Sequence, residues 1–174
     1  MNPDERAFAL ELLLARQRSL IATISSLSSE QWSRRAAEGT WTPAECVEHI
    51  VLVETSVYGK LEAAAGSTPA GVAAKALAEG KDSLVLRAVP DRRRRAVAPE
   101  SFRPREVWTL AGAIARFGET RGRTVEFTRS TTANLRDIVW PHPFLKELDG
   151  YQWLLFTAAH GERHRLQIEA ALNG

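Results

Sequence analysis

Apolar residues recur every three or four positions along four long stretches of the chain, which is the spacing of an amphipathic helix. Leu13, Leu20 and Ile24, for example, fall on one face of the first stretch. Alternating apolar and polar residues, which would indicate a half-buried strand, form no convincing run, and no Asn-Gly hairpin turn occurs. The pattern therefore predicts four helices, at about residues 3–27, 43–64, 105–129 and 150–172.

Capping sequences support the start of three of these helices. Thr42-Pro43-Ala44-Glu45 is a capping box, in which the threonine side chain accepts a backbone N–H and the glutamate side chain reaches back. Asn2-Pro3-Asp4-Glu5 follows the same logic, with proline inside the first turn. The last helix is expected to follow Asp149 and to end at Asn173-Gly174.

The connection between the second and third predicted helices spans residues 65–104, far too long for a hairpin between adjacent antiparallel helices. We expect it to contain a short helix from Pro69 to Glu79 and then to cross the bundle. Four helices with one long crossover form a known bundle topology. We therefore predict an all-α fold, a four-helix bundle with a long crossover between helices 2 and 3, in a single domain over residues 1–174.

The composition suits a globular protein of the cytoplasm. Hydrophobic residues make up 44% of the 174 positions and charged residues 25%, and no apolar run approaches the roughly 20 residues that span a bilayer. The first stretch carries charges throughout, unlike a signal peptide. One cysteine, Cys46, excludes an intrachain disulfide and fits a reducing compartment. We expect no membrane association.

Basic charge is concentrated in one segment of the chain. Residues 87–105 hold seven arginines against two acidic residues, whereas the whole chain has a net charge of +2. The run Arg92–Arg95 therefore raises the possibility of a nucleic-acid partner. We favour a solvated loop, because Pro90 and Pro99 lie beside the run and Phe102 is the one aromatic residue of the segment for stacking on bases. No nucleic-acid partner is expected.

Three of the four histidines fall inside predicted helices. His160 and His164 are four residues apart, so a helix presents them on the same face, and His49 lies in an apolar part of the second helix. Three neutral imidazoles and a solvent ligand make the open tetrahedral site of catalytic zinc proteins, and nickel or cobalt suits the same donors. The spacing alone fits an alternative equally well, in which His49 is a core residue and the pair His160 and His164 faces solvent. The sequence pattern does not show whether the two helices bring the three rings together.

Two motifs around these histidines resemble one known family. Trp41-Thr42-Pro43-Ala44-Glu45-Cys46-Val47-Glu48-His49-Ile50 is similar to the second-helix signature of the DinB-like (YfiT-like) metal-dependent hydrolase superfamily. His142-Pro143-Phe144, then Gly150-Tyr151, then the stretch 160–168 are similar to that family's ending, in the same order. The resemblance implies a four-helix bundle with a long crossover, a metal site with His49, His160 and His164 as ligands, and a homodimer, as in many members.

Characterised members of that family include S-transferases that use bacillithiol, mycothiol or glutathione, and a mycothiol-dependent isomerase. The resemblance therefore implies a metal-dependent enzyme acting on a small-molecule substrate, either a hydrolase or a thiol S-transferase, with metal-activated water or thiolate. The cofactor would be a divalent metal ion, zinc or nickel first, and a low-molecular-weight thiol could be the co-substrate. The alternative is a non-catalytic, stress-related bundle protein that binds a metal or a small ligand.

Helical spacing places four polar residues on the histidine-bearing faces, where they could line a pocket or bind the ligands: Glu45, Ser56, Thr157 and Gln167. Plain helix packing explains Thr157 and Gln167 about as well. Glu45 and Glu48 are candidate general bases, although the capping box explains Glu45 better. The role of His142, between two prolines, stays open, and a small buried thiol is the default for Cys46.

Overall fold

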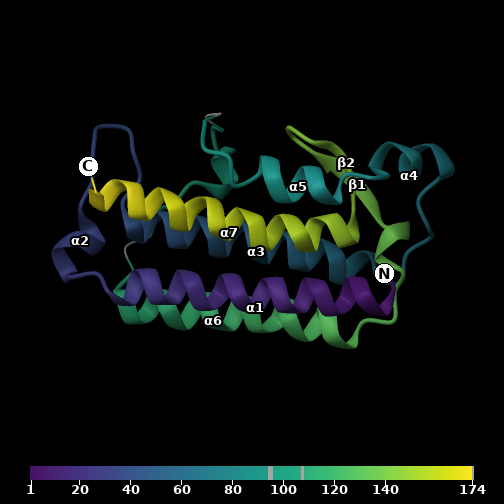
Figure 1. Ribbon diagram of the computed structural model, residues 1–174, viewed down its shortest axis with the longest axis horizontal. Helices are drawn as coiled ribbons and strands as arrows, with labels where there is room; N and C mark the ends of the chain where they lie inside the picture. Colours follow the sequence, from purple (N-terminus) through teal and green to yellow (C-terminus); the bar gives the residue numbers. More distant parts are fainter. Residues whose placement is uncertain (94–95, 107, 174) are drawn as a thin grey trace.

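Four long helices lie side by side in the computed structural model, which describes residues 1–93, 96–106 and 108–173 (Figure 1). The helices are α1 (Pro3–Ser25), α3 (Pro43–Ala64), α6 (Leu110–Ser130) and α7 (Gly150–Asn173). Helices α1 and α3 each pack against both α6 and α7, so the four form the corners of one bundle. The predicted all-α four-helix bundle is therefore confirmed.

Predicted and observed helix ends agree best where a capping box is present. The side chains of Thr42 and Glu45 bind each other's backbone N–H, and α3 has the predicted bounds. The first helix ends at Ser25 rather than at residue 27. The predicted start of the third helix at 105 is wrong: α6 begins at Leu110, because the Thr109 hydroxyl accepts the N–H of Gly112 and caps the helix there.

Several short elements connect the long helices. The short helix expected at 69–79 is α4 (Val72–Ala78), and the sequence did not predict α2 (Ser29–Ser33), α5 (Asp82–Ala88) or the single 3-10 turns η1 (Glu100–Phe102) and η2 (Leu135–Asp137). Along the crossover, α4 packs against the strand β2 (Lys146–Asp149), and α5 packs against α7. Residues 65–93 and 96–106 thus cross one face of the bundle, as Figure 1 shows.

A small antiparallel hairpin precedes α7. Its strands are β1 (Val139–His142) and β2 (Lys146–Asp149), with Val139 opposite Asp149 and His142 opposite Lys146. The sequence did not predict this hairpin, because β1 contains a proline and the turn has no glycine. His142 closes the turn instead, since its Nδ1 accepts the N–H groups of Phe144 and Leu145, each at 3.1 Å.

The apolar interior of the bundle contains one buried ion pair. Arg121 of α6 is 0% exposed and Glu54 of α3 is 2% exposed. The guanidinium donates to both oxygens of Glu54 at 2.8 Å and to the carbonyl of Leu13 in α1 at 2.9 Å. One arginine thereby joins three of the four long helices, and a shift of any of them along the bundle axis would break these hydrogen bonds.

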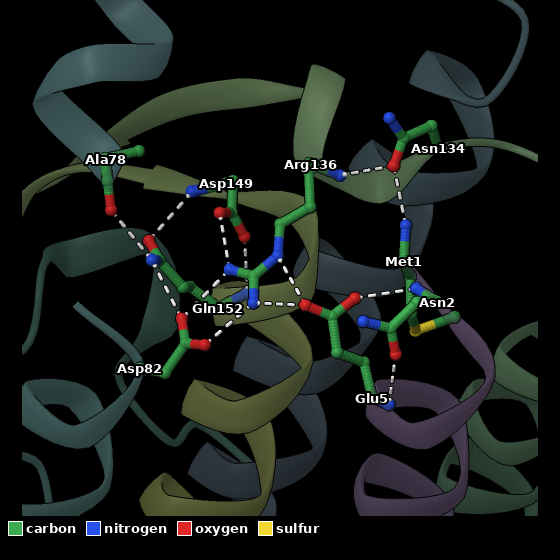
Figure 2. A network of polar contacts seen from close by, with 9 residues as sticks. All are labelled: Met1, Asn2, Glu5, Ala78, Asp82, Asn134, Arg136, Asp149 and Gln152. Atoms are coloured by element: carbon green, nitrogen blue, oxygen red, sulfur yellow. Dashed lines mark hydrogen bonds and ion pairs between the residues drawn. The ribbon is translucent and has the colours of Figure 1, made fainter. Parts of the chain in front are cut away.

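A second polar network holds the end of the bundle where the N-terminus lies (Figure 2). Arg136 of η2 pairs with Glu5 of α1 and Asp82 of α5, both at 2.7 Å, and with Asp149 at 2.8 Å. Asp149 in turn accepts the N–H of Gln152 and so caps α7. This network ties the first helix, the crossover and the start of the last helix to one guanidinium.

The same network should govern the response of the fold to acid. Hydrogen bonds from Arg136 hold the pKa of Asp82 below its ordinary value. Burial alone would raise the pKa of Glu5, but the hydrogen bonds from Arg136 and from the backbone of Asn2, with the nearby positive charges, together lower it. The stability that these carboxylates contribute is present above their unfolded pKa of about 4 and is lost as pH falls through the lower folded pKa. Arg136→Met should therefore lower the free energy of unfolding at neutral pH by about 2 kcal/mol and flatten its decline in acid.

Urea unfolding followed by circular dichroism between about pH 7 and pH 2 checks this expectation. Arg129→Met is the control, because Arg129 makes an exposed ion pair on α6. Equal acid dependence in the two variants would show that the network does not act through Arg136.

Candidate metal centre

Three imidazoles from two helices meet in the interior. His49 comes from α3, and His160 and His164 come from α7. The Nε2 atom of His160 lies 3.2 Å from the Nε2 of His49 and 3.2 Å from the Nε2 of His164. The three residues are 5%, 9% and 5% exposed in chain order. The fold thus brings together the histidines that the sequence could not show to converge, in a cluster that could hold a metal ion.

Hydrogen bonds at the opposite ring nitrogens set the orientation of two imidazoles. The Nδ1 of His49 lies 2.7 Å from the carbonyl oxygen of Phe102, and the Nδ1 of His164 lies 3.1 Å from the Oε1 of Gln167. Carbonyl oxygens only accept hydrogen bonds, so both Nδ1 atoms carry the proton and both Nε2 atoms present a lone pair. Each of these lone pairs faces the Nε2 of His160 at 3.2 Å, where a proton on that nitrogen or a cation would satisfy it.

Burial keeps all three rings in the neutral form that binds metal ions. Burial lowers the pKa of His49 below its ordinary value, although the carbonyl of Phe102 opposes the shift. The pKa values of His160 and His164 are lowered well below the ordinary value, first by burial and then by neighbouring positive charge. The cluster is therefore a set of three uncharged nitrogen donors at neutral pH.

Two aromatic rings flank the cluster. The ring of Trp41 lies 4.7 Å from that of His49 and is stacked over His164 at 5.9 Å. On the other side, Phe156 is stacked on His160 at 5.2 Å. These apolar surfaces limit the access of water to the imidazoles, which strengthens electrostatic interactions inside the site.

Comparison with known proteins supports the assignment suggested by the motifs. The sequence pattern of the DinB superfamily matches residues 12–168. The chain belongs to the DinB superfamily. Its fold is also similar to one solved structure, the "Crystal structure of TT2238, a four-helix bundle protein", with a TM-score of 0.60, 23% identity, and coverage of 95% of this chain and 98% of that chain. No curated protein matches this sequence.

The predicted pocket residues of this DinB-superfamily chain divide into two groups. Gln167 contacts a histidine of the cluster directly, through the Nδ1 of His164. Thr157 is buried on α7, and its hydroxyl donates to the carbonyl of Trp153, one turn earlier. Ser56 is half-buried two turns after His49, and within the described residues no hydrogen bond joins it to the imidazoles.

The two candidate bases on α3 are already engaged. Glu45 accepts the N–H of Thr42 at 2.7 Å and an Arg35 guanidinium N–H at 2.7 Å. Glu48 is 3% exposed, and its carboxylate accepts backbone N–H groups from the end of the crossover. Burial raises the pKa of the Cys46 thiol to about 12, so it stays protonated and is no nucleophile at neutral pH.

His142 belongs to the hairpin rather than to the imidazole cluster. Burial lowers its pKa to about 4, and its Nδ1 accepts the two N–H groups of the turn. Its ring contacts Phe156 at 4.8 Å, and Phe156 in turn stacks on His160. The hairpin therefore supports the aromatic wall of the site.

The arginine run makes contacts inside the chain where it can be described. Arg92 donates to the carbonyl of Leu166 on α7 at 2.9 Å, and Arg93 pairs with Asp91 at 2.7 Å. Arg94 and Arg95 lie outside the described residues. Arg92 thus fastens the crossover to the helix that carries two of the histidines, whereas Arg93 makes a local ion pair.

Sequence reasoning missed the carbonyl of Phe102, which orients His49. A backbone acceptor has no side-chain signature, and 53 residues separate it from its partner. It also missed Glu48 as a structural anchor. One signal was available: Glu48 and His49 are consecutive polar residues in an apolar part of α3, so both side chains would need hydrogen-bond partners if that part were buried.

The metal-free protein should lose stability as pH falls below about 6.5. Imidazoles of the unfolded chain take up protons there, whereas His49, His160 and His164 have lowered pKa values in the folded protein. The unfolded state then binds more protons, so acid favours it. Urea unfolding between about pH 8 and pH 5 should show a smaller loss for His160→Gln than for the wild type, and parallel curves would contradict the assignment.

Proposed function

We propose that this protein is a metal-dependent enzyme that acts on a small molecule, as a hydrolase or as a thiol S-transferase. His49, His160 and His164 would hold a divalent ion, zinc or nickel. The observation that carries the proposal is the convergence of three Nε2 atoms, with the lone pairs of two of them fixed by hydrogen bonds at Nδ1. A donor set of this kind fits a divalent cation better than any arrangement of protons.

The donor set also suits activation of a nucleophile. Three neutral imidazoles leave the double charge of a bound ion uncompensated, so the ion would supply Lewis acidity that lowers the pKa of water or of a thiol at its open position. The chain's own contribution is orientation: Phe102 and Gln167 hold two rings, and Trp41 and Phe156 keep water away. A low-molecular-weight thiol is the proposed co-substrate for the transfer reaction.

Both reactions require that the nucleophile lose a proton. Glu45 and Glu48 are held by other hydrogen bonds, and Cys46 remains a thiol. A general base must lie within hydrogen-bond reach of the proton it takes. We therefore propose that neither of these carboxylates of α3 takes the proton.

A non-catalytic protein that binds a metal or a small ligand is the second candidate. The low exposure of the three imidazoles favours it, since a closed site can store or sense a ligand without turnover. The two functions differ in the need for an open ligand position. Turnover that depends on added metal, with a thiol and a chromogenic electrophile or with an activated ester, would distinguish them.

Elemental analysis tests the metal site itself. Wild-type protein prepared with excess zinc or nickel should retain about one divalent ion per chain after desalting. His160→Ala should retain far less, because His160 lies next to both other ligands. His142→Gln is the matched control, since His142 is the fourth histidine and belongs to the hairpin. Wild-type protein without stoichiometric metal would refute the proposal.

Loss of the hydrogen bond to His164 should weaken metal binding without removing a ligand. Gln167→Ala takes away the acceptor at 3.1 Å from Nδ1, so the ring no longer favours the metal-binding tautomer. The dissociation constant should rise about 10- to 100-fold, measured by competition with a chromophoric chelator. Glu169→Ala on the same helix, where Glu169 is half-exposed, should leave it unchanged. Equal affinities in the two variants would contradict this role of Gln167.

A further inference from the structure

The end of the crossover is attached to α3 at two successive residues. His49 donates from Nδ1 to the carbonyl of Phe102 at 2.7 Å. Glu48 accepts the backbone N–H of Arg105 at 2.7 Å and that of Glu106 at 3.1 Å. Residues 102–106 therefore form a strap over the start of α3, fixed at both ends by neighbouring side chains.

Glu48 is an unusual carboxylate for its position. It is 3% exposed, yet the charge is met by backbone N–H groups, because Glu106 N–H reaches both carboxylate oxygens at 3.1 Å. The guanidinium of Arg105 turns instead to Glu100, at 3.3 Å. Successive N–H groups that converge on an anion form a favourable and directional site, and their loss would leave the buried polar groups unpaired.

We propose that Glu48 is a positioning residue of the metal centre, which holds the strap so that the carbonyl of Phe102 fixes the ring of His49. This inference rests on the proposed metal-dependent function. Glu48, next to the proposed ligand His49, would thus position the site rather than transfer a proton. Both of its oxygens are used within the strap, so it acts on the site through the backbone.

The strap is short, so the hydrogen bonds of Glu48 at one end affect the position of Phe102 at the other. Phe102 is three residues from Arg105, and the intervening residues 103–104 form no helix or strand. Without Glu48, the N–H groups of 105 and 106 lose their acceptor, and among the described residues the strap keeps one hydrogen bond to α3, at His49. The carbonyl of Phe102 then no longer holds one position, and His49 gains access to the tautomer with the proton on Nε2, which has no lone pair on the atom that faces the cluster.

The first test reads the tautomer of His49 in metal-free protein. Two-bond ¹H–¹⁵N NMR spectra distinguish a proton on Nδ1 from one on Nε2. Wild-type protein and Glu48→Gln should keep the proton of His49 on Nδ1, because the amide oxygen of glutamine still accepts from the strap. Glu48→Ala should give a mixture of both tautomers. An unchanged tautomer in folded Glu48→Ala would overturn the proposal.

The second test measures affinity for Co²⁺ by its visible absorption. The dissociation constant should rise about 10- to 100-fold in Glu48→Ala and stay within a few-fold of wild type in Glu48→Gln. Glu45→Ala is the matched control on the same helix: it loses the capping box and should melt earlier, but it should bind Co²⁺ as wild type does. If Glu48→Ala only melts earlier and binds Co²⁺ normally, Glu48 is merely structural and the inference fails.

The two tests also separate this inference from the proposed function. Wild-type protein that binds no Co²⁺ would refute the metal-dependent function, whatever Glu48 does. The tautomer of His49 would still report on positioning in that case, since the measurement needs no metal. A mixture in Glu48→Ala supports the positioning role, and a single Nδ1 tautomer refutes it.

Discussion

The constraint on which the structure depends is the burial of three neutral imidazoles with their Nε2 atoms 3.2 Å apart across His49–His160 and His160–His164. Such an arrangement costs more than a purely apolar core would, because six buried ring nitrogens are removed from water and each needs a hydrogen-bond partner or a cation. A cation bound by all three nitrogens, as proposed above, would offset this cost. The surrounding hydrogen bonds and aromatic rings follow from this requirement, since each donor must be held in one tautomer and one orientation.

Convergence of the imidazoles requires that α3 and α7 keep a fixed register. The buried pair of Arg121 and Glu54 serves this purpose, since it joins α6, α3 and, through the carbonyl of Leu13, α1. It also reaches α7, because a side chain at Gly161 would lie 3.7 Å from the Arg121 guanidinium. Buried ion pairs contribute little net stability but can fix register, and here the register determines whether His160 meets His49. The Arg136 network performs the same task at the end of the bundle that holds the N-terminus.

Local signals explain why the helices and the ligands could be predicted from the sequence. The capping box at Thr42 and Glu45 determines where α3 begins, and it thereby places His49 in the second turn. The four-residue spacing of His160 and His164 needs only a helix to bring them together. The strap, by contrast, binds α3 through backbone groups more than 50 residues away, and the start of α6 depended on Thr109 rather than on apolar periodicity. The hairpin escaped prediction because His142 closes its turn in place of glycine.

The candidate site is identified by its three nitrogen donors rather than by the volume of a cavity. The structure has hollows of about 470 Å³ and about 450 Å³, and both are lined by residues outside the imidazole cluster. In the larger hollow, Arg136 pairs with Asp82 and Asp149, and Lys75 pairs with Asp137, so most of its charges are already satisfied within the chain. No helix in the described ranges is long and apolar enough to cross a membrane. The imidazole cluster differs from these features because it brings three neutral nitrogen donors together, in an arrangement that could hold a metal ion.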